Sequence, residues 1–406
     1  MKTPLALLVL AVATLAAHAQ TVPPAGPAAV TAASGRCGVC HPAERVQFEK
    51  SRHALEGVRC VSCHGGNDRS LDAGTAHGAG FRGRPARQDN PRLCATCHAD
   101  EARMRPYNLP VDQYALYQTS GHGQRLARGD RQVAVCSDCH GAHEILAARD
   151  PASSVYQLNI PQTCGRCHGD QAGSAARGRR DVLKQYLSSV HARALIEQGN
   201  LRAPTCVSCH GVHGANPPNI GDIDKVCGQC HTAERRYYTS GEHAVARGGK
   251  RPECASCHEA HGVQAAQPER LASSCVVCHK GDARRLELGR RLWTDYHTAT
   301  AEVDKAAALV AKADAIPIQT EDYHARIEEA RTYLREALPA AHSVQPEVVA
   351  GFTTRARAVG QEVQKELEGK LANLRQHRYV LITFWFYVLL TLFVLKRFRD
   401  QAARNR

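Results

Sequence analysis

Residues 206–213 read Cys-Val-Ser-Cys-His-Gly-Val-His, and the pattern of this stretch recurs through most of the chain. Cys206 and Cys209 are spaced to take the two vinyl groups of a haem as thioethers, and His210 follows directly, where it can reach the iron. His213 lies too close in sequence to bind the opposite face of the same iron, but it is free to ligate a neighbouring haem. The octapeptide therefore predicts one attached haem and a ligand for a second.

The Cys-x-x-Cys-His motif occurs nine times and uses all 18 cysteines of the chain. A single copy would also fit a zinc ribbon or a thioredoxin-like site. Nine copies with no cysteine left over, behind a secretion signal, indicate nine covalent haems c instead. The predicted attaching residues are Cys37 and Cys40, Cys60 and Cys63, Cys94 and Cys97, Cys136 and Cys139, Cys164 and Cys167, Cys206 and Cys209, Cys227 and Cys230, Cys254 and Cys257, and Cys275 and Cys278. The predicted proximal iron ligands are His41, His64, His98, His140, His168, His210, His231, His258 and His279.

The composition fits a chain whose core is supplied by its cofactors. Aromatic residues make up 5% of the 406 residues and there are two methionines, which is little for a conventional core of this length. The formal charge of +13 first points to nucleic acid or anionic lipid. Nine haems, however, would bring about eighteen propionate groups that need cationic partners. We therefore expect most of the arginine excess to neutralise propionates, and we do not expect nucleic-acid binding.

The N-terminus is typical of an exported protein. Lys2 is followed by an apolar run from Leu5 to Ala17, and Ala17-His-Ala19 is a small-x-small cleavage site. Residues 1–19 are therefore predicted to be a signal peptide, and the Pro/Ala-rich residues 20–35 a disordered linker. Export agrees with haem chemistry, because c-type haem is attached outside the bacterial cytoplasm.

The C-terminus predicts a single membrane anchor. Residues 379–395 form an uncharged apolar run of 17 residues, and residues 378–397 are predicted to be a transmembrane helix. Residues 398–406 would be a basic cytoplasmic tail, in agreement with the positive-inside rule. These features predict a single-pass protein of the inner membrane with its haem domain in the periplasm. A buried core helix is the alternative.

Residues 36–282 form the predicted haem domain, in which pairs of motifs repeat. Each of four repeats holds a first motif, a free histidine, a second motif and a trailing histidine. Repeat one departs from this pattern, because His77 follows His64 by thirteen residues. The recurrence predicts that the spare histidines are distal iron ligands and that the haems are bis-histidine. The free histidines are His53, His122, His191 and His243, and the trailing ones are His77, His143, His213 and His261.

The ninth motif stands alone and leaves one distal ligand open. His297, eighteen residues after His279, and His342 are both candidates, and His324 is a third. His324 and His377 are otherwise expected to be solvent-facing or interfacial.

Residues 283–377 predict a helical bundle or stalk. One helix is expected over 283–315, ended by Pro317, and a second begins after a Thr320 N-cap. A third begins at Pro346 and continues into the membrane span. Three helices with short connections predict an antiparallel bundle. It could hold the haem domain away from the membrane or mediate homo-oligomerisation. The predicted fold class is thus mainly α, with little regular secondary structure in the haem domain.

The paired motifs resemble bacterial multihaem c-type cytochromes with doubled Cys-x-x-Cys-His repeats. The resemblance is carried by residues 104–114, by 120–123 and by 135–164, and Ala203-Pro-Thr-Cys-Val-Ser-Cys-His-Gly-Val-His is similar to the same family. So is Ala341-His-Ser-Val-Gln-Pro before the last helix, which favours His342 over His297. The family implies an extracytoplasmic electron carrier that works beside a membrane b-type cytochrome handling quinol.

Two functions remain from the sequence. The first is an electron-transfer cytochrome that relays electrons from a quinol-linked membrane partner to a periplasmic or outer acceptor. If every iron has two histidines, no site is open to substrate, and no catalytic residue is assigned. The second is a reductase of a small nitrogen or sulfur compound, which needs one open haem. No motif has lysine in place of its histidine, which would mark such a haem.

Overall fold

The structure is a computed structural model that describes residues 34–169, 181–216, 222–245, 251–316 and 318–404. These residues form helices and no strands, so the predicted mainly α class is confirmed. The predicted signal peptide, residues 20–33 of the predicted linker, Pro317 and the last two residues of the basic tail lie outside the described residues.

The chain divides into two compact bodies. The first body comprises Met1–Leu183 and Thr205–Asn216, and the second comprises Lys184–Pro204 and Pro217–Arg406.

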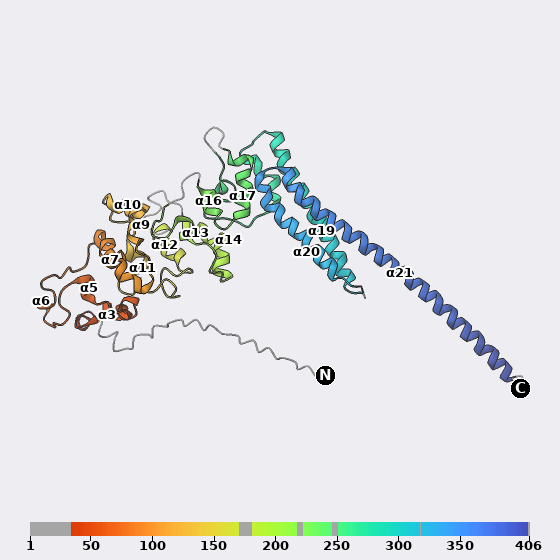
Figure 1. Cartoon of the computed structure of the whole chain (residues 1–406), viewed down its shortest axis with the longest axis horizontal. Coiled ribbons are helices and arrows are strands. Elements are labelled where there is room, and N and C mark those ends of the chain that lie inside the picture. Colours follow the sequence, from red (N-terminus) through yellow and green to blue (C-terminus); the bar gives the residue numbers. More distant parts are fainter. Residues whose placement is uncertain (1–33, 170–180, 217–221, 246–250, 317, 405–406) are drawn as a thin grey trace, which may run out of the picture. The chain divides into compact units, whose positions relative to one another are not determined.

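The first body consists of short helices joined by longer loops (Figure 1). Most motifs lie on a helix of four or five residues or at the end of one of nine residues. The helices are α2 (Cys37–Cys40), α3 (Pro42–Glu49), α4 (Arg52–Leu55), α5 (Cys60–His64), α6 (Ala73–Ala76), η1 (Arg87–Asp89), α7 (Asn90–His98), α8 (Glu101–Met104), η2 (Arg105–Tyr107), α9 (Gln113–Thr119), α10 (Gly121–Ala127), α11 (Cys136–His140), α12 (Ile160–His168) and α15 (Cys206–His210).

The second body begins with short helices joined by loops, as in the first body, and ends in three long helices. Its elements are α13 (Val182–Leu187, which begins in the first body), α14 (Val190–Ala192), η4 (Arg193–Glu197), α16 (Ile223–Cys227), α17 (Thr232–Ser240), η5 (Glu242–Ala244), α18 (Cys254–His258), η6 (Pro268–Ala272), η7 (Ser274–Val277), α19 (Ala283–Ala313), α20 (Glu321–Ala340), η8 (Ala341–Ser343) and α21 (Pro346–Arg404).

The second motif of each repeat carries its own helix-starting signal. The third residue of the motif accepts a hydrogen bond from the backbone N–H of the residue just before the first cysteine, which caps the short helix. The four bonds are Arg59 N to Ser62 Oγ (3.3 Å), Val135 N to Asp138 Oδ2 (2.7 Å), Thr205 N to Ser208 Oγ (3.1 Å) and Glu253 N to Ser256 Oγ (3.0 Å). In the first motif of repeat two the third residue, Thr96, instead donates its hydroxyl to the Leu93 oxygen at 2.7 Å.

A buried serine caps the helix that carries the free histidine in the first three repeats. Ser51, Ser120 and Ser189 are fully buried, and each precedes its histidine by two residues. Each hydroxyl oxygen accepts a backbone N–H three residues on, at 3.1, 3.0 and 3.1 Å. The cap fixes the first turn of the helix and with it the direction in which the histidine points.

The three long helices pack around an apolar core. The core contains Val303 from α19, Ile327 from α20 and Val363 from α21, all buried. Gly360 lies where α21 meets α19, and a Cβ there would make ordinary van der Waals contact with the Cα of Val303 at 3.5 Å. Thr320 precedes α20 as expected, but its side chain does not cap that helix and instead hydrogen-bonds to Asp314.

Helix α21 continues without a break from the bundle through the apolar run. Figure 1 shows α19 and α20 beside its first half, while its second half runs on alone. The large apolar residues from Tyr379 to Phe398 are exposed. α21 is the one helix in the described residues that is long and apolar enough to cross a bilayer. This arrangement is consistent with single-pass anchoring in a membrane.

Candidate functional site: paired histidines between repeats

Within the described residues, motif histidines face other histidines at a nearly constant spacing. Two imidazoles bound on opposite sides of one iron, each with its nitrogen about 2 Å from the metal, would have ring centroids about 6 Å apart. The observed spacings run from 5.9 to 6.4 Å. The residues present therefore fit a haem iron between each pair. The pairs are His41–His77 (6.2 Å), His53–His98 (5.9 Å), His64–His143 (6.1 Å), His122–His168 (6.1 Å), His140–His213 (6.1 Å), His191–His231 (6.3 Å), His243–His279 (6.4 Å) and His258–His342 (6.0 Å).

The pairs follow a rule that joins neighbouring repeats. The free histidine of each repeat faces the first motif of the next repeat, as His53 faces His98 and His191 faces His231. The ninth motif continues this rule, because His279 faces His243 of repeat four. The ninth motif is thus the start of a repeat that goes no further.

Trailing histidines follow the opposite direction. His143 and His213 each face the second motif of the preceding repeat, at His64 and His140. A trailing histidine therefore serves a motif that lies more than 70 residues earlier in the chain.

The departure at His77 has a structural reason. No repeat precedes the first motif, so no free histidine is available for His41, and His77 occupies that position instead. His77 is held by a loop whose backbone bonds include Asn67 N to Ala76 O at 3.0 Å and Arg82 N to His64 O at 2.7 Å. The loop needs glycine at Gly65, where φ is +71° and a Cβ would lie 1.9 Å from the Gly80 oxygen.

Of the three candidates for the remaining ligand, His342 is the one that faces a motif histidine. Its ring lies 6.0 Å from that of His258 and is tilted by 26°. His297 lies 4.9 Å from the ring of Trp293 on its own helix, and His324 is bonded to Asp314 at 3.0 Å. The Nδ1 atom of His377 lies 2.8 Å from the Asn373 oxygen on the exposed part of α21.

His210 and His261 fall in the two different bodies. The Nδ1 atom of His210 lies 3.0 Å from the Asn216 oxygen, a contact that fixes the direction of its ring. The ligand roles of these two residues remain predictions.

The two attachment sites of each repeat lie side by side. The first cysteines of its two motifs lie close enough for one thiol to perturb the pKa of the other in all four repeats: Cys37 with Cys60, Cys94 with Cys136, Cys164 with Cys206, and Cys227 with Cys254. Successive repeats of the first body meet instead through the second cysteine of the earlier repeat's second motif, as Cys63 lies near Cys97 and Cys139 near Cys164. Within each body, consecutive motifs are therefore neighbours in space as well as in sequence.

Burial favours the neutral form of several of the paired histidines. Burial lowers the pKa of His53, His140 and His258, with a further lowering from the facing histidine. A lowered pKa keeps imidazole neutral, and neutral imidazole is the form that binds a metal ion. Burial also raises the pKa of the Cys60 and Cys139 thiols to about 11.

A tyrosine that is buried or half-buried joins the free-histidine helix to the second motif in repeats two to four. Tyr117, Tyr186 and Tyr238 each lie five residues before the free histidine of their repeat. Each hydroxyl donates a hydrogen bond to the carbonyl oxygen two residues before the first cysteine of the second motif, at 2.9, 2.9 and 2.8 Å. Repeat one has Phe48 at this position. This contact was not predicted from the sequence, although the fixed spacing of five residues between tyrosine and histidine was a signal that could have revealed it.

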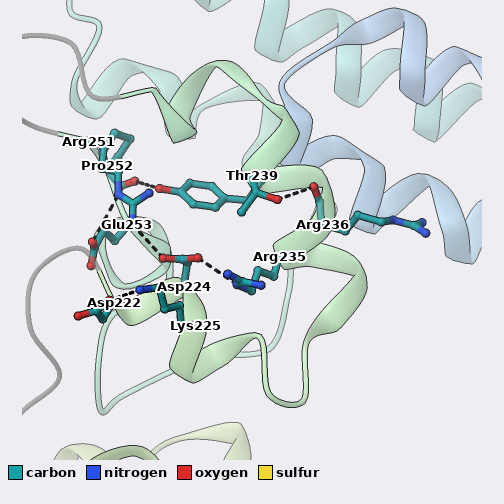
Figure 2. A network of polar contacts seen from close by, with 10 residues as sticks. Asp222, Asp224, Lys225, Arg235, Arg236, Thr239, Arg251, Pro252 and Glu253 are labelled. Atoms are coloured by element: carbon teal, nitrogen blue, oxygen red, sulfur yellow. Dashed lines mark hydrogen bonds and ion pairs between the residues drawn. The ribbon is translucent and has the colours of Figure 1, made fainter.

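Arginine–carboxylate pairs also join the two motifs of a repeat. In repeat four, Asp224 is buried on α16 and accepts from Arg235 Nε at 3.0 Å and Arg251 Nη2 at 2.9 Å (Figure 2). In repeat two, Arg87 binds both carboxylate oxygens of Asp138, at 2.9 and 2.5 Å. Part of the arginine excess therefore pairs with carboxylates of the chain itself, in addition to the expected propionates.

Comparison with known proteins gives a match over part of the chain. No curated protein and no solved structure matches significantly. Residues 129–232 match the model of the family described as cytochrome c3, over about a quarter of the chain. This segment holds the motifs that begin at Cys136, Cys164, Cys206 and Cys227. The match supports a multihaem c-type cytochrome that carries covalently bound haem c and transfers electrons.

Proposed function

We propose that this protein is a membrane-anchored cytochrome that holds nine bis-histidine haems c and relays electrons between a quinol-linked membrane partner and a periplasmic acceptor. The observation that carries the proposal is the set of histidine pairs with centroids 5.9–6.4 Å apart. The recurrence of this spacing along the array is what a row of identically coordinated irons requires.

Attachment is the task of the 18 cysteines, taken as nine pairs. In each motif the two thiols would hold the haem as thioethers and the following histidine would supply the proximal nitrogen. The histidine that faces it would supply the distal nitrogen. When bound, haem c supplies a one-electron carrier whose potential depends on its axial ligands, its burial and nearby charge.

The exchange of ligands between repeats holds the array together. His53 reaches forward to the next repeat and His143 reaches back to the preceding one. With haem bound, repeat two would therefore be held to repeat one, and repeat three to repeat two, by two coordination bonds in addition to ordinary packing. Because consecutive attachment sites within each body also adjoin through their cysteines, this arrangement would hold consecutive haems close together, which a relay needs.

Two histidines at each iron also argue against the alternative of a reductase with one open haem. The two uncertain positions in the sequence were His77 and the last distal ligand. We assign His77 to the first motif, and His342 rather than His297 to the eighth, because each faces a motif histidine.

The C-terminal half of α21 supports anchoring in the inner membrane. Its apolar residues from 379 to 395 are exposed, as lipid-facing residues would be. Lys396, Arg397 and Arg399 follow directly, and the positive-inside rule favours the cytoplasm for them. The haem-binding residues would then lie in the periplasm. The donor we propose is a membrane b-type cytochrome that oxidises quinol, and the acceptor is a periplasmic or outer redox protein.

Haem counting tests the proposal. The protein is produced in a bacterium that attaches haem c, and the mature chain is weighed intact while its haem is measured as the pyridine adduct. We expect nine covalent haems per chain, with the signal peptide removed. A mature chain with four haems, matching only the cytochrome c3 segment, would contradict the proposal.

A further inference from the structure

Neighbouring repeats are seated on one another by the same backbone hydrogen bond. The residue that follows the capping serine donates its N–H to the carbonyl two residues beyond the trailing histidine of the next repeat. The loop of the trailing histidine is thereby fixed on the start of the free-histidine helix. The three bonds are Arg52 N to Ile145 O (2.8 Å), Gly121 N to Ala215 O (3.1 Å) and Val190 N to Val263 O (2.8 Å).

Repeat four differs at the position of the capping serine. The residue two before its free histidine His243 is Gly241, where the other repeats have Ser51, Ser120 and Ser189. No further trailing histidine follows, because the ninth motif is not followed by a tenth. The segment that packs against Gly241 therefore comes from a part of the chain outside the repeats.

The turn η8 of the helical bundle lies directly on this glycine. A Cβ at Gly241 would be 2.5 Å from the Ser343 oxygen, 2.8 Å from its Cα and 2.9 Å from its carbonyl carbon. All three are backbone atoms, so they cannot move aside as a flexible side chain could. Any residue larger than glycine would therefore displace the turn.

The turn itself is well defined. The Ser343 hydroxyl donates to the Ala340 oxygen at 2.7 Å and accepts from Gln345 N at 3.2 Å. Val344 adopts a left-handed conformation with φ of +57°, which directs the chain into α21. On the neighbouring helices, Phe352 of α21 packs edge-on against Tyr237 of α17 at 6.5 Å.

His342 lies in this turn and faces His258, the histidine of the second motif of repeat four. That is the relationship by which His143 faces His64 and His213 faces His140. The η8 turn thus supplies both features that a following repeat would supply. It packs against the segment that carries the free histidine, and it provides the histidine that faces the second motif.

We propose that the three-helix bundle takes the place of a fifth repeat, and that Gly241 is the positioning residue that admits the η8 turn and so delivers His342 to the eighth haem. This inference rests on the proposed function. It implies that the membrane anchor and the haem array are joined through an iron ligand. Loss of the packing between η8 and Gly241 should remove the distal ligand of the eighth haem and leave both ligands of the other haems in place.

The test replaces Gly241 by alanine or by valine in the full-length protein. The matched control is Gly351→Ala or Gly351→Val in α21 of the same body, where a Cβ would meet no described atom within 4 Å. In Gly241→Val we expect nine haems by mass, one of them high-spin and able to bind carbon monoxide when reduced. Adding His342→Ala should open no second haem. Gly351→Ala should leave all haems low-spin.

A second measurement serves if the valine variant does not fold. Hydrogen exchange of the amides of residues 341–345 should be at least tenfold faster in Gly241→Ala than in wild type and in Gly351→Ala. Unchanged spin states together with unchanged exchange would overturn this inference and leave the proposed function intact. A wild-type protein with few or high-spin haems would instead overturn the proposed function.

Discussion

The imidazole of His53 lies 5.9 Å from that of His98, although the two residues belong to different repeats. His53 stands between the two motifs of repeat one, and a reading by sequence proximity would assign it to one of them. The ring pair assigns it to the third motif. Through this exchange of ligands, one repeat supplies the motif that attaches the haem and a neighbouring repeat supplies the distal histidine.

Replacement of His53 by alanine should therefore open the third haem and no haem of repeat one. We expect one haem in nine to become high-spin, because its iron loses its distal nitrogen. Carbon monoxide binding to the reduced protein measures this fraction.

The identity of the opened haem is checked by removing its attachment site. In a variant with Cys94→Ala and Cys97→Ala, the further change His53→Ala should open no additional haem. Carbon monoxide binding that persists in this combined variant would show that His53 serves another motif.

Removal of the Tyr117 hydroxyl should loosen the free-histidine helix of repeat two. Tyr117→Phe deletes the 2.9 Å hydrogen bond to the Ala134 oxygen and leaves that carbonyl without its partner, at a cost of about 1–2 kcal/mol in the free energy of unfolding. Denaturant unfolding measures the loss. The control is Tyr107→Phe, whose ring is 42% exposed and whose change should have no effect. Equal stability of the two variants would contradict a role for the hydroxyl.

The same tyrosine should give the protein a measurable alkaline limit. Burial raises the pKa of Tyr117 to about 12, above its ordinary value of 10.0. The folded state then holds the proton more tightly than the unfolded state. The resulting stability is fully present below pH 10 and is lost as the pH rises toward 12. The free energy of unfolding, measured between pH 10 and 12, should decrease less steeply with pH in Tyr117→Phe than in wild type. Identical slopes for the two proteins would contradict the raised pKa of Tyr117.

The buried carboxylate of Asp224 should contribute more to the free energy of unfolding than the exposed carboxylate of Asp222 (Figure 2). Asp224→Asn removes the charge that pairs with Arg235 and Arg251. We expect a loss of about 2 kcal/mol, less than the ~3–5 kcal/mol of a fully buried pair, because the two arginine side chains keep 41% and 24% of their exposure. Thermal unfolding provides the comparison. Asp222→Asn, whose exposed side chain pairs with Lys225, should be indistinguishable from wild type, and a matching loss there would refute the distinction.

The motifs show why part of this site could be predicted from the sequence. Attachment depends on residues adjacent in the chain, so Cys206, Cys209 and His210 could be recognised without a fold. Distal ligation depends on which loop meets which motif. The sequence therefore identified His143 and His213 as spare ligands without indicating the motifs that they face.

The choice of the last distal ligand shows more clearly what sequence spacing cannot decide. His297 and His342 both follow the final motif, and spacing alone does not separate them. The separation comes from packing, because η8 rests on Gly241 and places His342 opposite His258. The exchange of a capping serine for Gly241 was visible in the sequence, but its meaning depends on the turn that covers it.

The fold shows the same division. Long helices with an apolar stripe were predictable, and α19, α20 and α21 begin at or within a residue of the expected positions. The haem-binding parts have short helices fixed by caps and by contacts between repeats. Periodicity carries no signal over four or five residues.

Truncation after Arg378 should release the protein from the membrane. The shortened chain lacks the exposed apolar part of α21 but keeps the bundle residues up to Leu367 that pack against α19 and α20. We expect it in the soluble periplasmic fraction with nine haems and an unchanged spectrum. A truncated chain that stays with the membrane would mean that another part of the protein anchors it.

The most direct test of the account is a count of iron sites that lack a second histidine. Electron paramagnetic resonance of the oxidised full-length protein, with carbon monoxide titration of the reduced protein, gives this number. The account predicts nine low-spin haems and no binding of carbon monoxide. One or more high-spin haems that bind carbon monoxide in the wild-type protein would contradict it and would point to a reductase.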